Sequence, residues 1–294
     1  MKEIIDLAYG NPGFLQELWQ SHNFLTNLSS HSLMPYKFGK QSSPSLAEEI
    51  KLLHKSQRNV LITESTRIVI TVGAVQALQA AMYAYQKVME TKTLYVPAPY
   101  WTRFDYFARI NGLTISTSET DEAISLITSP NNPNGVDQSN KPAHIRDACY
   151  NWSHYTKNVQ EFSDKVVLFS LAKLSGHAST RIGWAVVHDV QLGKFMQYYV
   201  NTITSGVSVE SQESALGIIK HLNQSPDFFV QGNKILENRY QQLEDLITQK
   251  SLPIKVLSTQ GMFWYIQCDP KVISALAIDC SPGEEFKDTQ PDTF

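Results

Sequence analysis

The sequence has few cysteines, no long apolar run and no excess of charge of one sign, and each absence excludes a class of protein. Cys149, Cys268 and Cys280 are odd in number and lack CxxC spacing, so we expect reduced thiols rather than a disulfide framework. No apolar run reaches the roughly 18–20 residues that a membrane-spanning helix needs. The net charge is −3, with 25 basic and 28 acidic residues well mixed, which makes nucleic acids and membranes poor candidate partners.

Several functional motifs are also missing. The eight histidines show neither HxxxH nor HExxH spacing, and Cys149 with His154 does not match a zinc pattern, so no metal site is predicted. Gly73 opens no phosphate-binding loop of the GK[ST] type. The N-terminus has no apolar core of a signal peptide, and together with the reduced thiols this favours a cytoplasmic protein.

Short β-branched runs alternate with helical patterns over the first two thirds of the chain. Continuous apolar strands that alternate with helices predict an α/β fold, with a mostly parallel sheet of the seven-stranded type covered by helices on both faces. Helices are predicted over 74–90 and 101–112. Strands are predicted over 67–73, 93–99, 123–130, 165–171 and 183–189.

The texture changes after Asp189. Three helical stretches (190–204, 211–224 and 228–249) precede two short strands, 254–257 and 262–268. We therefore predict an N-terminal arm with part of a small domain (1–40), a large domain (41–225) and a small C-terminal α+β domain (226–294). The aromatic "MFWY" is interpreted as a strand of the small domain's core, and the polar stretch 280–294 as neither helix nor strand.

Polar residues follow the predicted strands, where ligands of α/β sheets bind. Gly73-Ala74-Val75 opens a helix, which is either a tight turn or an anion site. "SPNNPNG" (129–135) is either a turn or a rigid mount for an amide. Asp147 and Tyr150 can line one site only if the chain turns after Asp147.

Lys173 and Arg181 lie eight residues apart in "SLAKLSGHASTRIGW", among small and hydroxylated residues. Either the two cations are solvated at a bend, or an anion lies between them. A partly desolvated Lys173 beside another cation would have a lowered pKa, which would make its amine a nucleophile able to form an imine.

The motifs "APYW", "SPNNPNG", "DACY" and "SLAK", followed by Arg181, stand in an order that resembles the fold-type I pyridoxal-phosphate (PLP) enzymes, the aspartate-aminotransferase superfamily. "IRDACYNWSHYT", "SLAKLSGHASTRIGWAVV" and "SGVSVESQ" are more closely similar to its alliinase and plant tryptophan-aminotransferase branch. The resemblance extends from about Gly10 to Gln267. It implies a homodimer with shared active sites, small-molecule substrates and pyridoxal 5′-phosphate as cofactor.

The resemblance also implies catalytic roles. Lys173 would hold the cofactor aldehyde as an imine and later move the substrate's α-proton. Asp147 would keep the pyridine nitrogen protonated, so that the ring acts as an electron sink. Asn132 and Tyr150 would bond the phenolic oxygen, and Trp101 would stack on the ring; Asn132 and Trp101 would also face the substrate.

The family's phosphate site would map onto Ser170, Arg181 and the backbone of Gly73-Ala74-Val75. Positions 74 and 75 carry no hydroxyl here, in contrast to many relatives, so one or two hydrogen bonds of about 1.5–3 kcal/mol each are lost unless Gln76 compensates. Gly10 would let the substrate carboxylate approach the backbone. Tyr36 matches the tyrosine that reaches the partner subunit's phosphate.

The function that these residues imply is an aminotransferase for an L-amino acid, with aromatic ones as candidates, and a 2-oxo acid. A C–S lyase (β-elimination) or another biosynthetic PLP reaction is the alternative, followed by a non-catalytic PLP-fold binding protein. The family usually binds the substrate α-carboxylate with a C-terminal arginine, but the last arginine here is Arg239. Truncation, another mode of carboxylate binding and loss of ordinary transaminase activity all fit this departure.

Overall fold

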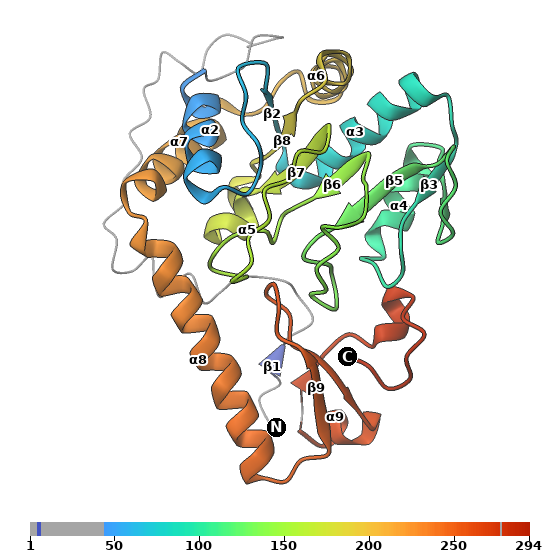
Figure 1. Ribbon diagram of the computed structural model, residues 1–294, viewed down its shortest axis with the longest axis vertical. Coiled ribbons are helices and arrows are strands. Elements are labelled where there is room, and N and C mark those ends of the chain that lie inside the picture. Colours follow the sequence, from blue (N-terminus) through green and yellow to red (C-terminus); the bar gives the residue numbers. More distant parts are fainter. Residues whose placement is uncertain (1–4, 7–43, 277) are drawn as a thin grey trace.

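A seven-stranded sheet forms the centre of the computed structural model, which describes residues 5–6, 44–276 and 278–294. Its strand order is β2-β8-β7-β6-β5-β3-β4 (Figure 1). The strands are β2 (Arg67–Thr71), β3 (Thr93–Tyr95), β4 (Thr114–Ser116), β5 (Ile124–Thr128), β6 (Ile145–Asp147), β7 (Val166–Ser170) and β8 (Gly183–Val187). Neighbours from β7 through to β4 run parallel, whereas β8 is antiparallel to both β7 and β2. The predicted fold class, α/β with a mostly parallel sheet, is confirmed.

Helices cover both faces of this sheet. They are α2 (Pro44–Gln57), α3 (Gly73–Met89), α4 (Arg103–Ile110), α5 (Leu171–Ser175), α6 (Val190–Thr204) and α7 (Val209–Gln224). Helix α6 begins where it was predicted, because the Asp189 carboxylate accepts hydrogen bonds from the backbone N–H groups of Gln191 (2.8 Å) and Leu192 (2.9 Å). Helix α2, which was not predicted, packs on α7.

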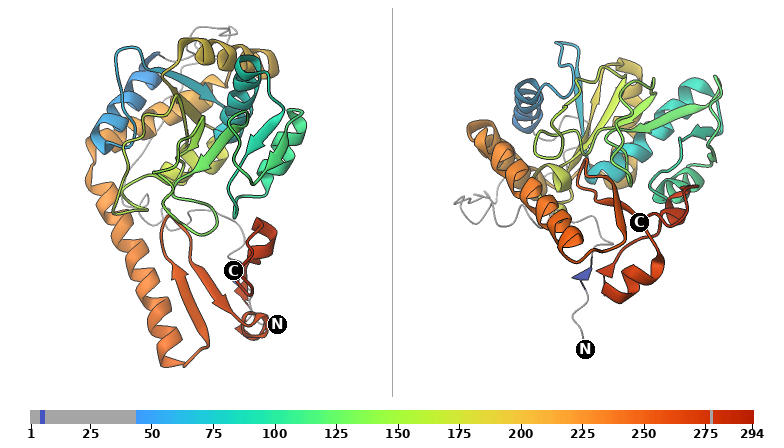
Figure 2. Two further views of the ribbon diagram at one scale, coloured as in Figure 1. Left: turned by 45° about the vertical axis from the view of Figure 1, so that its right-hand side comes forward. Right: turned by 60° about the horizontal axis from the view of Figure 1, so that its bottom comes forward.

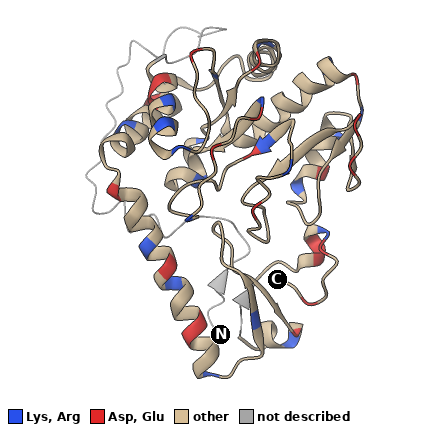
Figure 3. Ribbon diagram, in the orientation of Figure 1, with Lys and Arg blue, Asp and Glu red and all other residues tan. Residues whose placement is uncertain are grey.

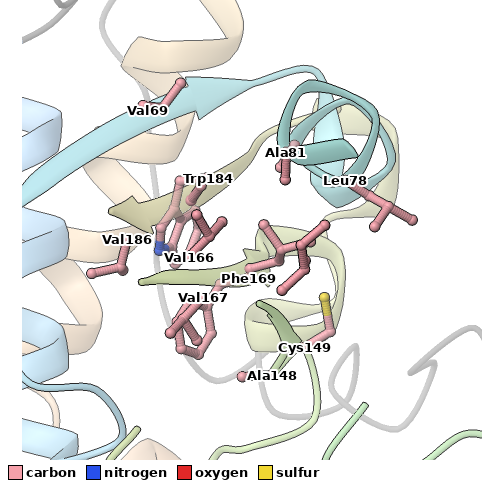
Figure 4. Packing of buried hydrophobic residues seen from close by; sticks show 14 of the residues in the cluster. Val69, Leu78, Ala81, Ala148, Cys149, Val166, Val167, Phe169, Trp184 and Val186 are labelled. Atoms are coloured by element: carbon pink, nitrogen blue, oxygen red, sulfur yellow. The ribbon is translucent and has the colours of Figure 1, made fainter. Parts of the chain in front are cut away.

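The alternation of side chains along β8 explains the two layers. Trp184 points toward α2, where its indole N–H donates to His54 Nε2 at 2.8 Å. Val187, of opposite parity, faces α6 and lies within van der Waals distance of the Gly193 position. All five residues of β7 and of β8 are buried, so these strands form the middle of the hydrophobic core (Figure 4).

The C-terminal part of the chain extends from one end of the large sheet. Helix α8 (Asp227–Gln249) packs its first half on the core through Phe228, Phe229, Gly232 and Leu236. Both views of Figure 2 show α8 leading to the antiparallel pair β9 (Ile254–Ser258) and β10 (Tyr265–Cys268). Charged residues of both signs alternate along the length of α8 (Figure 3), and its second half is mostly exposed.

The remaining elements are short. Helix α9 (Pro270–Leu276) follows β10, and β1 (Ile5–Asp6) pairs in parallel with β11 (Ile278–Asp279). The segment 280–294 was predicted to hold neither helix nor strand, but it contains a 3₁₀ turn, η3 (Gly283–Phe286), and its last residue exchanges two backbone hydrogen bonds of 2.9 Å with Ile266. The predicted domain boundaries, including the one after residue 225, stay predictions.

Candidate active site

Most of the candidate site residues lie at one end of the large sheet, where the parallel strands have their carboxyl termini. The carboxyl ends of β5, β6 and β7 lie here, with Thr128 opposite Asp147 and Asp147 opposite Leu168. Because β8 is antiparallel, its first residue, Gly183, lies opposite Ser170 at the end of β7. Gly183 also pairs with Thr71, the last residue of β2. Residues far apart in the sequence therefore form one row.

The N-terminus of α3 rests against this row with no room for a side chain. Gly73 has φ +71°, and a Cβ there would lie 2.5 Å from Arg181 Nη2. A Cβ on Gly183 would overlap the backbone of Gly73 and Ala74. Two glycines thus let the first turn of α3, the β8 backbone and the Arg181 guanidinium converge.

Arg181 itself is held in a left-handed conformation after the 3₁₀ turn η2 (Ala178–Thr180), with φ 54°. Its Nη1 donates to the Ala178 carbonyl at 2.8 Å. This bond aims the Nη2 side of the fork toward Gly73. A guanidinium beside the free N–H groups of a helix N-terminus is suited to a phosphate dianion.

The other predicted phosphate residues lie at the same place. Ser170 is buried and stands at the N-cap position of α5, and Ala74 and Val75 belong to the first turn of α3. The Gln76 carboxamide, named as a compensating group, accepts from the Val72 N–H at 2.8 Å and lies 3.4 Å from Thr204 Oγ1. Gln76 therefore helps to cap α3.

Lys173 lies on the short helix α5, directly after β7. Its Nζ is 5.8 Å from the centre of the Tyr150 ring, and its backbone carbonyl accepts a hydrogen bond of 2.7 Å from the Tyr155 hydroxyl. Burial lowers the pKa of Lys173, and the nearby Cys149 and Asp147 oppose part of that shift. A lysine of this kind keeps a larger fraction of its amine neutral and nucleophilic.

Asp147 ends β6, and the chain turns immediately after it, as a shared site with Tyr150 requires. Its Oδ1 accepts a hydrogen bond from the Cys149 backbone N–H at 3.1 Å. Burial raises the pKa of Asp147, while the bonds from Cys149 and the charge of Lys173 act in the opposite direction. Such a carboxyl is favourably ionised only when a cation or donor reaches it.

Tyr150 and Asn132 meet from two different loops. Asn132 Nδ2 lies 3.5 Å from the Tyr150 hydroxyl, at the limit of a hydrogen bond. Burial raises the pKa of Tyr150, so its phenol stays protonated and can donate. The neighbouring Asn131 holds the loop in place, since its Nδ2 donates to the Pro99 carbonyl and to Asn134 Oδ1, both at 2.9 Å.

Trp101 is half-buried beside α4, where its ring packs edge-on against Phe104 (5.5 Å) and Phe107 (5.8 Å). It lines a pocket of about 480 Å³ together with Val75 and Arg181. The geometry therefore brings Trp101, the first turn of α3 and Arg181 to one cavity.

The sequence interpretation missed one contributor, the turn between β9 and β10. Phe263 packs edge-on against the Tyr150 ring at 4.8 Å, and its carbonyl accepts from the Tyr240 hydroxyl at 3.1 Å. Trp264, the next residue, packs in the small apolar cluster around Ile266 instead. The interpretation of "MFWY" as a strand is thus wrong for its first three residues, since β10 begins at Tyr265, and Met262 and Phe263 pack on the large core. Successive side chains of an extended segment point to opposite sides, so the sequence could have indicated that Phe263 and Trp264 face different parts of the molecule.

Two predicted site residues, Gly10 and Tyr36, lie outside the described residues. The other ten positions divide into three groups that the fold brings to one end of the sheet. Gly73, Ala74, Val75, Ser170 and Arg181 lie at or next to the first turn of α3. Asn132, Asp147, Tyr150 and Lys173 lie at or just beyond the carboxyl ends of β5 to β7, and Trp101 lines a pocket with Val75 and Arg181.

Comparison with known proteins identifies the family of the chain. The family model described as Allinase matches residues 5–263. Tryptophan aminotransferase-related protein 2 of Arabidopsis thaliana is 30% identical over 244 residues, covering 76% of this chain and 55% of the relative. Alliin lyase of Allium cepa var. aggregatum is also 30% identical over 244 residues, covering 74% of this chain and 54% of the lyase. The chain thus spans about half of the length of these curated relatives.

Solved aminotransferases share the fold. An aspartate aminotransferase double mutant from Thermus thermophilus superimposes with a TM-score of 0.76 at 18% identity, covering 97% of this chain and 85% of that one. A putative kynurenine aminotransferase from Saccharomyces cerevisiae gives a TM-score of 0.74 at 14% identity, with coverages of 97% and 83%. Within the described residues, none of the helices is both long and apolar enough to cross a membrane.

Proposed function

The chain belongs to the alliinase family of fold-type I PLP enzymes, and on that basis we propose that it is an aminotransferase for an L-amino acid and a 2-oxo acid. One observation carries the proposal. A lysine with a lowered pKa, a half-buried carboxyl with a raised pKa and a guanidinium at a helix N-terminus share one end of the sheet. Aromatic amino acids are candidate donors, in line with the name of the Arabidopsis relative.

The residues present fit pyridoxal 5′-phosphate, the cofactor of this family. The cradle that a Cβ on Gly73 or Gly183 would fill, with Arg181 beside it, suits the phosphate. The Asp147 carboxyl, whose raised pKa calls for a cationic partner, suits the pyridine nitrogen. Lys173 would hold the aldehyde carbon, and Trp101 would cover a face of the ring. When bound, this cofactor supplies an electron sink for a carbanion at the substrate Cα.

The chain's own residues then divide the work of proton handling. The neutral amine of Lys173 would take up the α-proton of the substrate and could later return it. Asp147 would hold a proton on the ring nitrogen of the cofactor, and the Cys149 backbone N–H keeps the Asp147 side chain in place. Tyr150 and Asn132, which lie within 3.5 Å of each other, would donate hydrogen bonds to the ring oxygen of the cofactor, and Phe263 packs edge-on against the Tyr150 ring.

A β-eliminating C–S lyase is the second candidate. The alliin lyase of Allium cepa var. aggregatum and the Arabidopsis tryptophan aminotransferase-related protein have the same identity to this chain, 30%. The same Lys173 could remove the α-proton in both reactions, after which the fate of the carbanion differs. In transfer, Lys173 would also return a proton, whereas in elimination the substrate would lose its β-substituent.

An assay of the products separates the two. We expect tryptophan or phenylalanine with a 2-oxo acid to yield the new amino acid, and the half-reaction without acceptor to leave pyridoxamine phosphate. Pyruvate and ammonia from an S-alkyl cysteine sulfoxide without any acceptor would instead establish the lyase. If the cofactor binds and no arm of the assay forms either kind of product, both enzymatic candidates are contradicted and a binding protein is favoured. Lys173→Ala is the control and should abolish turnover in every arm.

A homodimer with shared active sites is part of the proposal. Large apolar side chains are exposed on α4 and α6 on either side of the pocket, among them Ile110 (70%), Tyr106 (61%) and Ile203 (60%). Exposed apolar patches of this kind are typical of subunit contacts. Sedimentation at micromolar concentration should give twice the chain mass; a monomer with full activity would contradict shared sites.

A further inference from the structure

The pocket beside Trp101 carries two cationic side chains and lacks a carboxylate. It lies between α3, α4 and the end of α6, with Gln76 and Gln79 on one wall and Phe107 on another (Figure 1 locates the helices). Arg181 and Arg103 both line it. None of its lining residues is acidic, so a positive potential is left uncompensated within the pocket.

Arg103 is the less expected of the two. It opens α4, and Phe107, one turn later on the same helix face, also lines the pocket. Within the described part of the chain, no carboxylate forms an ion pair with Arg103. The nearest acid in sequence, Asp105, instead accepts a hydrogen bond from the Tyr100 hydroxyl at 3.0 Å and lies 4.0 Å from Lys287 Nζ.

The first turn of α3 lacks side-chain donors on this same pocket. Ala74 and Val75 carry none, and the Gln76 carboxamide already bonds Val72 and lies against Thr204. A phosphate at this helix end would therefore receive the backbone N–H groups and Arg181, but few side-chain hydrogen bonds from α3 itself. A second guanidinium across the pocket would supply the missing donors.

We propose that Arg103 is a second cationic ligand of the cofactor phosphate, reaching across the pocket from α4 to replace the hydroxyl donors that α3 lacks. This inference rests on the proposed function and adds a residue to its cofactor site. It makes Arg103 a binding residue, with no part in proton transfer.

The test compares two forms of the cofactor, pyridoxal 5′-phosphate and pyridoxal, which differ only in the phosphate. Dissociation constants are measured by absorbance and by tryptophan fluorescence on cofactor-free protein. We expect Arg103→Gln to raise the constant for pyridoxal 5′-phosphate about tenfold and to leave that for pyridoxal unchanged. Arg103→Lys keeps the charge and loses the planar fork, so its dissociation constant for pyridoxal 5′-phosphate should lie between those of the wild type and Arg103→Gln.

Matched variants control the comparison. Arg109→Gln removes an exposed arginine of the same helix that does not line the pocket, and it should change neither constant. Arg181→Gln should raise the constant for pyridoxal 5′-phosphate alone. Because Arg103 is exposed, its substitution should leave the denaturation midpoint unchanged, so altered binding does not report unfolding.

Three results would overturn the inference. If Arg103→Gln weakened the binding of both ligands equally, Arg103 would contact another part of the cofactor. If it changed neither dissociation constant, Arg103 would not belong to the site. If Arg109→Gln weakened the binding of pyridoxal 5′-phosphate as much, the effect would come from general surface charge. Failure of the proposed function looks different. In that case the wild type would bind pyridoxal 5′-phosphate no better than pyridoxal, and Lys173→Ala would change neither.

Discussion

Gly183→Ala should damage the phosphate end of the site without touching any residue that carries chemistry. A Cβ at this position would lie 2.9 Å from Gly73 Cα, and closer still to the Gly73 carbonyl carbon and the Ala74 nitrogen. Carbon atoms prefer separations of about 3.5–4.0 Å, so the first turn of α3 must move away from β8 by more than about 0.5 Å. Both sides of the contact are backbone, and no flexible side chain can absorb the shift.

The size of the effect follows from two costs. Overpacking of a buried contact destabilises the folded state by about 1–3 kcal/mol. A displaced helix end also loses a hydrogen bond to a charged acceptor, about 1.5–3 kcal/mol, which corresponds to a roughly 10- to 100-fold weaker affinity for pyridoxal 5′-phosphate. Absorbance titration of cofactor-free protein measures the second cost, and urea denaturation measures the first.

Gly193→Ala is the matched control. Its Cβ would meet the flexible Arg67 side chain at 3.3 Å and would lie at the end of the first turn of α6, where alanine favours the helix by up to about 1 kcal/mol. This variant should bind the cofactor like the wild type. Wild-type cofactor affinity in Gly183→Ala would refute the claim that the junction of β8 and α3 forms the phosphate cradle.

Two further predictions concern other parts of the molecule. His54 is fully buried, accepts from the Trp184 indole and has a pKa lowered by burial from 6.5 to about 4. Only the unfolded chain therefore takes up this proton between those values, and stability should fall by about 3 kcal/mol as pH decreases from 6.5 to 4. The free energy of unfolding, measured by denaturation across this pH range, should decrease toward low pH with a slope that corresponds to one more proton in the wild type than in His54→Gln. The same slope in both proteins would contradict the assignment. Phe263→Ala should lower kcat/KM about 2- to 10-fold by freeing the Tyr150 ring, because aromatic pairs contribute about 0.5–1.5 kcal/mol. Trp264→Ala, which faces the other cluster, should lower stability instead, and equal kinetic effects of both variants would argue against a specific role for Phe263.

Five strands of the large sheet were predicted because they lie in apolar runs, whereas β4 and β6, three residues each with the sequences TIS and IRD, were missed. Helix α6 has the bounds that were predicted, and the structure shows that the Asp189 side chain caps its first turn. Helix α2 was missed, and its apolar stripe makes sense only once α7 lies beside it. The extent of β10 was also overestimated, because Met262 and Phe263 belong to a turn that docks on the large core.

The site was predicted in part, and the rest depends on long-range packing. Asp147 and Lys173 follow strands that neighbour each other, so their proximity follows from the order of the parallel sheet. The need for glycine at position 183 could not be predicted, because the clash involves a helix more than 100 residues away in sequence. Arg103 has no distinguishing sequence pattern, and only the folded structure shows that it lines a pocket together with Arg181.

The most direct test of the account is the visible absorbance of the purified protein after addition of pyridoxal 5′-phosphate. We predict a band from the lysine-bound cofactor that shifts with pH, that an amino donor bleaches, and that Lys173→Ala abolishes. Lys165→Ala, at the opposite end of β7, should keep the band. Absence of the band in the wild type, or its persistence in Lys173→Ala, would contradict the assignment of Lys173 and with it the central claim.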